Sequence, residues 1–223
     1  MKHILFIITS TNVTGAGKHA AGFEFSEVAD SYFEFTNQGY TVDFASILGG
    51  SPPFVGYDES QIISKNFKEG NGFKRLNFSH KLSDVATDAY DAIFFPGGLG
   101  PMTDMVTNPL VKETIKKVYE SGRVVGAVCH GPVALLNITL SNGKNLLAGK
   151  KINSFTASEE NIDGHVLKDV IPFMLDAELK KQGAIFSHTT PFDAFVLADG
   201  NLVTGQNPAS ASGVALAMID LLI

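Results

Sequence analysis

Short, largely apolar runs recur along the chain, separated by segments in which apolar residues return at helical spacing. The runs occupy residues 4–8, 41–45, 92–95, 124–128 and 152–155. Because they do not alternate strictly between apolar and polar positions, they predict strands that are buried on both faces, as in a parallel sheet covered by helices.

The intervening segments predict helices. Residues 23–38 carry apolar side chains at helical spacing, and Gly39 follows as a stop. Asn108 and Pro109 predict the N-cap and first position of a second helix, which Gly122 ends. A last helix is predicted from Asn207-Pro208 to the C-terminus. Strands alternating with helices predict an α/β fold, with a doubly wound, mostly parallel sheet in a flavodoxin-like sandwich.

One segment interrupts this alternation. Residues 49–90 are rich in Gly, Pro, Ser, Asn and charged residues and exceed the length of an ordinary connection. Scattered aromatic and branched residues within them favour an ordered excursion that covers the active face over a disordered loop. We therefore expect residues 1–223 to form a single domain with 49–90 as its cover.

Composition narrows the functional classes. Hydrophobic residues make up 44% of the 223 residues, charged residues 18%, and the formal net charge is −6 without a basic block. Such a chain is expected to be globular, with neither nucleic acid nor a membrane as its partner. The apolar run at residues 4–8 is too short for a secretory signal or a membrane span. One cysteine cannot form an internal disulfide, so we expect a cytoplasmic protein.

That cysteine, Cys129, stands where the predicted strand 124–128 turns into the next element, in the stretch Gly126-Ala-Val-Cys-His-Gly-Pro132. A small-residue turn between strand and helix holds one reactive atom clear of a sheet. The amides of a following helix would lower the pKa of the thiol below about 8.5 and favour the reactive thiolate. A buried structural cysteine is the alternative. The adjoining histidine and the Gly-Pro favour a nucleophile.

Other residues supply partners for a thiolate. Gly97 and Gly98 follow the predicted strand 92–95, and the amides of Gly98 and His130 would together form an oxyanion hole. Glu24, Glu27 and Glu34 read as the solvated face of the first helix. Glu159 and Glu160 follow the predicted fifth strand, whose carboxyl end belongs on the same side of the sheet as Cys129. The remaining histidines, His3, His19, His80, His165 and His188, have no spacing typical of a metal site.

Several of these segments together resemble the ThiJ/PfpI superfamily, within the class I glutamine-amidotransferase-like fold. The matching segments are residues 127–132 (AVCHGP), 96–98 (PGG), 100–102 (GPM), 154–156 (SFT) through Glu159-Glu160, 172–175 (PFML) and 204–210 (TGQNPAS). Residues 204–210, Gly22-Phe23 leading to Glu27, and residues 49–53 (GGSPP) resemble its heat-shock-protein-31-type branch, whose members are glutathione-independent glyoxalases.

The resemblance implies roles for individual residues. Cys129 matches the nucleophile, Glu27 the helix glutamate that hydrogen-bonds the sulfur, and His130 the adjoining histidine. Glu160 best matches the carboxylate that orients the histidine, with Glu159 as the competitor. Leu99 departs from the branch, which commonly has histidine after Gly-Gly. An apolar residue there removes a possible hydrogen-bond donor at the pocket edge and bears on the substrate preference.

The activity implied is conversion of a 2-oxoaldehyde such as methylglyoxal to D- or L-lactate, through a hemithioacetal on Cys129 and a proton transfer by His130 or Glu27. The resemblance implies neither a cofactor nor a metal. It does imply association as a homodimer. Three alternatives stay open: a stress-response holding chaperone that binds unfolded protein clients, a protein deglycase, and a redox sensor based on Cys129. A peptidase or a glutamine amidotransferase has less support.

Overall fold

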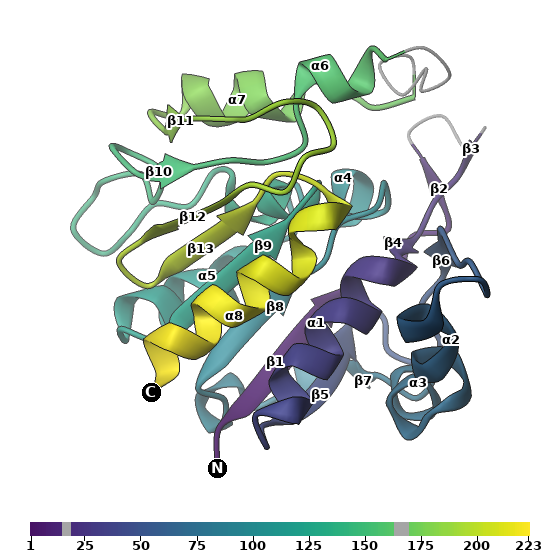
Figure 1. Ribbon diagram of the computed structural model, residues 1–223. Helices are drawn as coiled ribbons and strands as arrows, with labels where there is room; N and C mark the ends of the chain where they lie inside the picture. The colour runs from purple at the N-terminus through teal and green to yellow at the C-terminus, as the bar shows by residue number, and fades with distance from the viewer. Residues whose placement is uncertain (15–18, 163–169) are drawn as a thin grey trace.

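A computed structural model describes residues 1–14, 19–162 and 170–223; His165 lies outside the described residues. Its centre is a seven-stranded sheet in the order β12-β13-β9-β8-β1-β5-β7 (Figure 1). The strands are β1 His3–Ile8, β5 Thr41–Ser46, β7 His80–Lys81, β8 Ala92–Phe95, β9 Val124–Val128, β12 Val196–Asp199 and β13 Leu202–Gly205. All neighbours are parallel except β12 and β13. The predicted α/β class and its mostly parallel sheet are confirmed.

Helices cover both faces of this sheet. Helices α1 (Phe25–Asn37) and α8 (Ala211–Leu222) lie side by side on one face, and α5 (Pro109–Glu120) packs on the other (Figure 1). Along β1, Phe6 and its alternate neighbours join the core under α1 and α8, whereas Leu5 and Ile7 join the core under α5. This division explains why the run is apolar at successive positions: both faces of the strand are buried.

The ends of the helices agree with the sequence only in part. Asn108 caps α5, since its Oδ1 accepts from the amides of Leu110 and Val111, as predicted. The first helix starts two residues later than predicted, because residues 23–24 are extended and form β4 (Phe23–Glu24). In that strand the amide of Glu24 donates to the carbonyl of Gly97, which removes it from the helix. The last helix is also delayed: Pro208–Ser210 form a 3₁₀ turn, and α8 begins at Ala211.

The predicted fifth strand, at residues 152–155, is wrong as a member of the central sheet. Only Lys151–Ile152 form a strand, β10, and it pairs with β11 (Ile185–Phe186) in a separate two-stranded sheet. Residues 153–155 leave that strand because their amides bond elsewhere: Asn153 to the hydroxyl of Thr204, and Phe155 to the carbonyl of Cys129. The central sheet instead ends in β12 and β13, which the sequence pattern did not predict.

The excursion at residues 49–90 contains β6 (Phe54–Val55), α2 (Ile62–Glu69), α3 (Asn71–Leu76) and β7. The two helices pack beside α1 and β5 at one edge of the sheet (Figure 1), where aromatic rings from α1, α2 and α3 meet, among them Phe25, Phe67 and Phe73. β6 pairs with β4, and β7 pairs with the carboxyl end of β5, the neighbouring strand of the central sheet.

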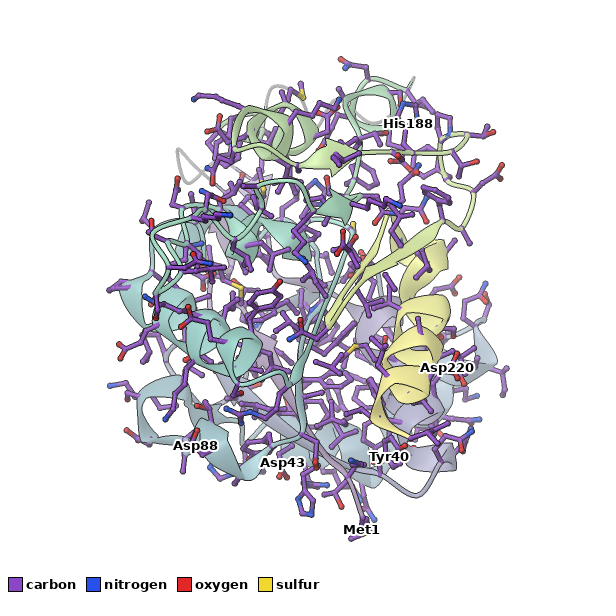
Figure 2. The ribbon with its side chains drawn as sticks, turned by 90° about the vertical axis from the view of Figure 1, so that its left-hand side faces the viewer. Met1, Tyr40, Asp43, Asp88, His188 and Asp220 are labelled. Atoms are coloured by element: carbon purple, nitrogen blue, oxygen red, sulfur yellow. The ribbon has the colours of Figure 1, made fainter. Side chains whose placement is uncertain are left out.

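The other short elements are β2 (Val13–Thr14), β3 (His19–Ala20), α4 (Pro101–Asp104), α6 (Ala157–Glu160) and α7 (Leu175–Lys181). With β10 and β11, helices α6 and α7 form a layer beyond the carboxyl ends of the strands (Figure 1). His188 lies in that part of the molecule, opposite the end with Met1 and Tyr40 (Figure 2). Among the described residues, no helix combines the length and apolarity that crossing a bilayer requires.

Candidate active site

Cys129 follows the last residue of β9, close to where the strand order reverses around β1 and β8. Its backbone has φ 60°, a left-handed conformation that costs a non-glycine residue about 1–2 kcal/mol. The next element along the chain is a 3₁₀ turn, Gly131–Leu135, where the sequence predicted a helix. The elbow therefore holds the sulfur at the end of the sheet, but a long helix dipole does not stabilise it.

The loop after β8 closes over this elbow. A methyl group built on Gly97 would lie 2.7 Å from the amide nitrogen of His130 and 2.8 Å from Cβ of Cys129, so only glycine fits there. Gly98 has φ 84°, and its N–H donates to the Cys129 sulfur. The loop thus brings backbone donors within reach of a ligand at the sulfur.

His130 connects Cys129 to Glu160. Its Nδ1 lies 3.4 Å from the sulfur, and its Nε2 lies 2.8 Å from Oε1 of Glu160. Both side chains are at most 3% exposed. With Glu160 as a carboxylate, Nε2 carries a proton and donates it, which leaves Nδ1 as the nitrogen that exchanges a proton with the thiol. Phe155 stacks against the imidazole with ring centroids 4.7 Å apart, which fixes the ring plane.

The neighbouring Glu159 has a different position. Its carboxylate accepts five hydrogen bonds, from the amide and hydroxyl of Thr156, the amide of Phe192, and the side-chain amides of Gln206 and Asn207. These bonds join α6 to the segments on either side of β12 and β13. Glu160, and not Glu159, is therefore the carboxylate bonded to His130.

Glu27 is completely buried next to Cys129, as the family resemblance implied, and not on the solvated face that the helix pattern alone indicated. Its Oε2 accepts from the amide of Gly97 at 2.5 Å, and its carboxyl group also interacts with the Cys129 side chain. Burial, and next the charge of Glu24, raise the pKa of Glu27 well above its ordinary value. The buried carboxyl is thus favoured in its protonated form.

The expected low pKa of Cys129 is also wrong for the protein without substrate. Burial is the largest cause that raises the pKa of this thiol, followed by the neighbouring Glu27, while the N–H of Gly98 opposes them. Desolvation disfavours the thiolate more than the short turn after Cys129 favours it. Without substrate, the neutral thiol form of Cys129 is therefore favoured.

A cavity of about 240 Å³ opens at the sulfur. Apart from Gly98, Cys129 and His130, it is lined by Glu24, Val55, Leu99, Phe155, Phe192 and Pro208. Leu99 thus belongs to its wall, whereas Glu27 and Glu160 lie behind the residues that line it. The sequence reasoning missed Glu24, which was assigned to a solvated helix face. It also missed four wall residues from separate segments: Val55, Phe155, Phe192 and Pro208.

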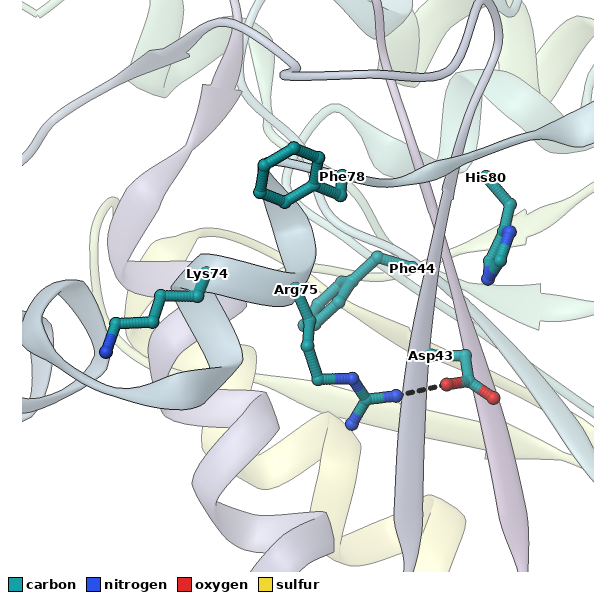
Figure 3. A pocket seen from close by; sticks show the side chains of 6 residues that line it. All are labelled: Asp43, Phe44, Lys74, Arg75, Phe78 and His80. Carbon is teal, nitrogen blue, oxygen red and sulfur yellow. Dashed lines mark hydrogen bonds and ion pairs between the residues drawn. The ribbon is translucent and has the colours of Figure 1, made fainter.

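A larger hollow of about 310 Å³ lies at the edge of the sheet between β5 and α3 (Figure 3). Its wall contains an ion pair between Asp43 and Arg75, together with Lys74, Phe78 and His80. It holds neither a nucleophile nor a buried acid. We therefore assign the chemistry to the smaller cavity at Cys129. Within the described parts of the chain, no group of three or more His, Cys, Asp or Glu side chains is arranged to hold a metal ion.

The chain has a mostly parallel sheet between helices, with a cysteine on a strained turn at the end of a central strand. A histidine lies next to this cysteine, and a buried glutamate is bonded to the histidine. These features define a class of α/β proteins whose site contains a cysteine on such a turn. Residues 19–221 match the DJ-1/PfpI family, and the chain belongs to it. The glutathione-independent glyoxalase HSP31 of Saccharomyces cerevisiae is 32% identical, over 99% of this chain and 98% of that protein.

Two solved structures are similar over nearly their whole length. The Rapid Encystment Protein 24 kDa of Francisella tularensis has a TM-score of 0.94 and 33% identity, with all of both chains covered. Glyoxalase III of Candida albicans has a TM-score of 0.88 and 28% identity, over 99% of this chain and 97% of that one.

Proposed function

We propose that this protein is a glutathione-independent glyoxalase of the glyoxalase III type, which converts methylglyoxal or a related 2-oxoaldehyde to a 2-hydroxy acid. The observation that carries the proposal is the Cys129 sulfur at a small, mostly apolar cavity, with Nδ1 of His130 3.4 Å away. The relatives named glyoxalases, which match this chain over nearly its full length, support the same activity.

The reaction begins with addition of the thiol to the aldehyde. As the Cys129 sulfur bonds to the aldehyde carbon, its proton passes to Nδ1 of His130 and then to the new hydroxyl oxygen. The carboxylate of Glu160, bonded to Nε2, stabilises the imidazolium that forms in between. The product is a hemithioacetal.

His130 next removes the hydrogen from the carbon bound to sulfur. The electron pair moves toward the neighbouring carbonyl and forms an enediolate, whose oxygen charge the amides of Gly98 and His130 stabilise. Return of the proton to the second carbon, with transfer of the hydroxyl proton from the first carbon's oxygen to the second carbon's oxygen, gives a 2-hydroxy thioester. Water then replaces the sulfur, so the sum is methylglyoxal plus water giving lactate, with the thiol regenerated and no oxidant consumed.

Glu27 has a supporting role in this proposal, because the cavity wall does not include it. With a proton on its carboxyl it removes a negative charge from beside the sulfur, which lowers the cost of forming the thiolate. We assign the proton transfers at carbon to His130 and the orientation of that ring to Glu160.

The experiment that tests the function is a product assay without glutathione. Purified protein given methylglyoxal is expected to form lactate, with D- and L-lactate dehydrogenases reporting the enantiomer, and the Cys129→Ala variant is expected to form none. Lactate formation no greater than in that variant would overturn the proposal.

The redox-sensor alternative is disfavoured, because peroxide reacts with thiolate and the raised pKa of Cys129 keeps that form scarce. The remaining expectations extend the proposal: a single-domain, cytoplasmic enzyme that associates as a homodimer. Light-scattering mass measurement tests the dimer. Suppression of client aggregation by the Cys129→Ala variant would add a holding-chaperone role.

A further inference from the structure

Glu24 is the carboxyl group inside the cavity. It ends β4, directly before α1, and its Oε1 accepts a hydrogen bond from the hydroxyl of Ser26 at 3.4 Å. Gly56 makes room for it, because a methyl group built there would collide with the Glu24 carboxyl. Ser26 and Gly56 thus fix the position of Glu24. Glu24 does not belong to the sequence motifs around Cys129.

The other carboxyl groups near the sulfur are bonded to other parts of the protein. Glu160 bonds the imidazole of His130, Glu159 accepts five hydrogen bonds from its surroundings, and Glu27 is bonded to the amide of Gly97. None of these three carboxyl groups lines the cavity. Apart from Cys129 and His130, Glu24 is the one polar side chain among the described residues of its wall.

The proposed reaction also needs a residue that binds the hydrolytic water, and none has been assigned so far. One base beside the sulfur suffices to move a proton between two adjacent carbons, and Nδ1 of His130 is in that position. The water that cleaves the thioester is a separate molecule, which needs its own polar partner to stay in a cavity. The side chains of Val55, Leu99, Phe155, Phe192 and Pro208 offer it none.

We propose that Glu24 holds this water and acts as the general base of the hydrolytic step. The step rests on the glyoxalase function proposed above. The Glu24 carboxylate takes one proton from water as the water oxygen bonds to the thioester carbon. The tetrahedral intermediate then breaks its carbon–sulfur bond, the electron pair leaves with the Cys129 sulfur, and the proton held by Glu24 returns to the sulfur.

The electrostatics of Glu24 suit this role. Burial raises its pKa from 4.5 to about 7, while Ser26 and the amides of Phe25 and Ser26 oppose the rise. A base whose pKa lies near the working pH is present in its active form and still holds a proton well. The charged or titratable groups beside it are Glu27, Cys129 and His130. Since the base is the carboxylate, hydrolysis accelerates as pH rises through about 7.

The test is a Glu24→Gln variant mixed with methylglyoxal and followed by intact-protein mass spectrometry. We expect steady-state lactate formation to fall about 10²-fold, while protein carrying one lactoyl group on Cys129 accumulates within the first turnover. The rise in turnover with pH near neutrality is expected to disappear. A Glu24→Asp variant, which keeps the carboxylate, is expected to restore part of the rate.

Glu34→Gln is the matched control, since it removes a carboxylate from α1, the helix that follows Glu24, outside the cavity. It is expected to behave as the unmodified protein. Wild-type turnover in Glu24→Gln, or loss of turnover without an accumulated acyl-enzyme, would overturn the role of Glu24. Failure of the proposed function is distinguishable, because the unmodified protein would then form no lactate.

Discussion

The residues on the two sides of Cys129 use their polar groups differently. The polar side consists of Glu27, His130, Glu159 and Glu160, all of them buried, with hydrogen bonds to most of their polar atoms. The cavity side consists of Val55, Leu99, Phe155, Phe192 and Pro208, with Glu24 as its one carboxyl group.

The difference separates two tasks. On the polar side hydrogen bonds to neighbouring groups fix the positions of Cys129 and His130 in the absence of substrate. On the cavity side there is space and little polarity, so substrate is selected by shape and apolar contact. Changes on the polar side should therefore alter the rate or the stability, and changes on the cavity side the choice of substrate.

The largest effect is expected from Glu160→Gln. The amide keeps the size of the side chain but no longer stabilises a protonated His130, so kcat/KM for methylglyoxal should fall by about 10²-fold or more. The rate of Cys129 alkylation should fall with it, because His130 removes the thiol proton less readily. The exposed Glu113→Gln serves as control, and unchanged kinetics in Glu160→Gln would contradict the assignment.

Glu159→Ala is expected to act on stability instead. It leaves buried donors of Thr156, Gln206 and Asn207 unpaired, at a cost of about 3–5 kcal/mol in the free energy of unfolding. Urea unfolding measures this loss of stability. The control is Glu69→Ala, which removes an exposed carboxylate from α2. A loss below about 1 kcal/mol, within the range of ordinary surface substitutions, would show that the five bonds contribute little.

Glu27→Gln is expected to change how stability depends on pH. A carboxyl whose pKa is raised on folding binds its proton more tightly in the native state, so stability falls as pH rises above the unfolded pKa of about 4.5. Glutamine mimics the protonated acid and cannot ionise. Melting temperatures measured from pH 5 to 9 should therefore decline less in the variant; identical slopes would argue against a protonated Glu27.

The smallest effect is expected from Leu99→His, on the cavity side. Exchanging an apolar wall residue for a polar one weakens contact with large apolar substituents, so kcat/KM for phenylglyoxal relative to methylglyoxal should fall about tenfold. Val55→Ile, which stays apolar, is the comparison. A Leu99→His variant with the same ratio as the unmodified protein would remove Leu99 from the specificity determinants.

Much of the fold and part of the site could be read from the sequence. The runs at residues 92–95 and 124–128 coincide with β8 and β9, because a strand buried on both faces must be apolar throughout. The elbow at Cys129 could be inferred from its small neighbours. The branch motif and the position after 152–155 pointed to Glu160, although the strand that was to carry it lies outside the central sheet.

The features that sequence reasoning missed depend on tertiary contacts. Only the family resemblance placed Glu27 at the sulfur, because the helix pattern was interpreted as a solvated face. Glu27 lies four residues before Ser31 and eight before Phe35, both buried, so its helical spacing did carry a signal. The raised pKa of Cys129 could not be foreseen, because it depends on how deeply the elbow is covered. Glu24 was not predicted as a cavity residue because its position depends on the pairing of β4 with β6. No local sequence pattern indicates that pairing.

The hydrogen bonds of Glu159 have a consequence for folding kinetics. They join residues from position 156 to position 207, and the cavity adds Glu24 and Val55 from the first quarter of the chain. Contacts between such distant positions form late, because loop closure must precede them. Enzymatic activity is therefore a reporter of complete folding, and in refolding experiments it should return only with the slowest phase, after the helical signal has recovered.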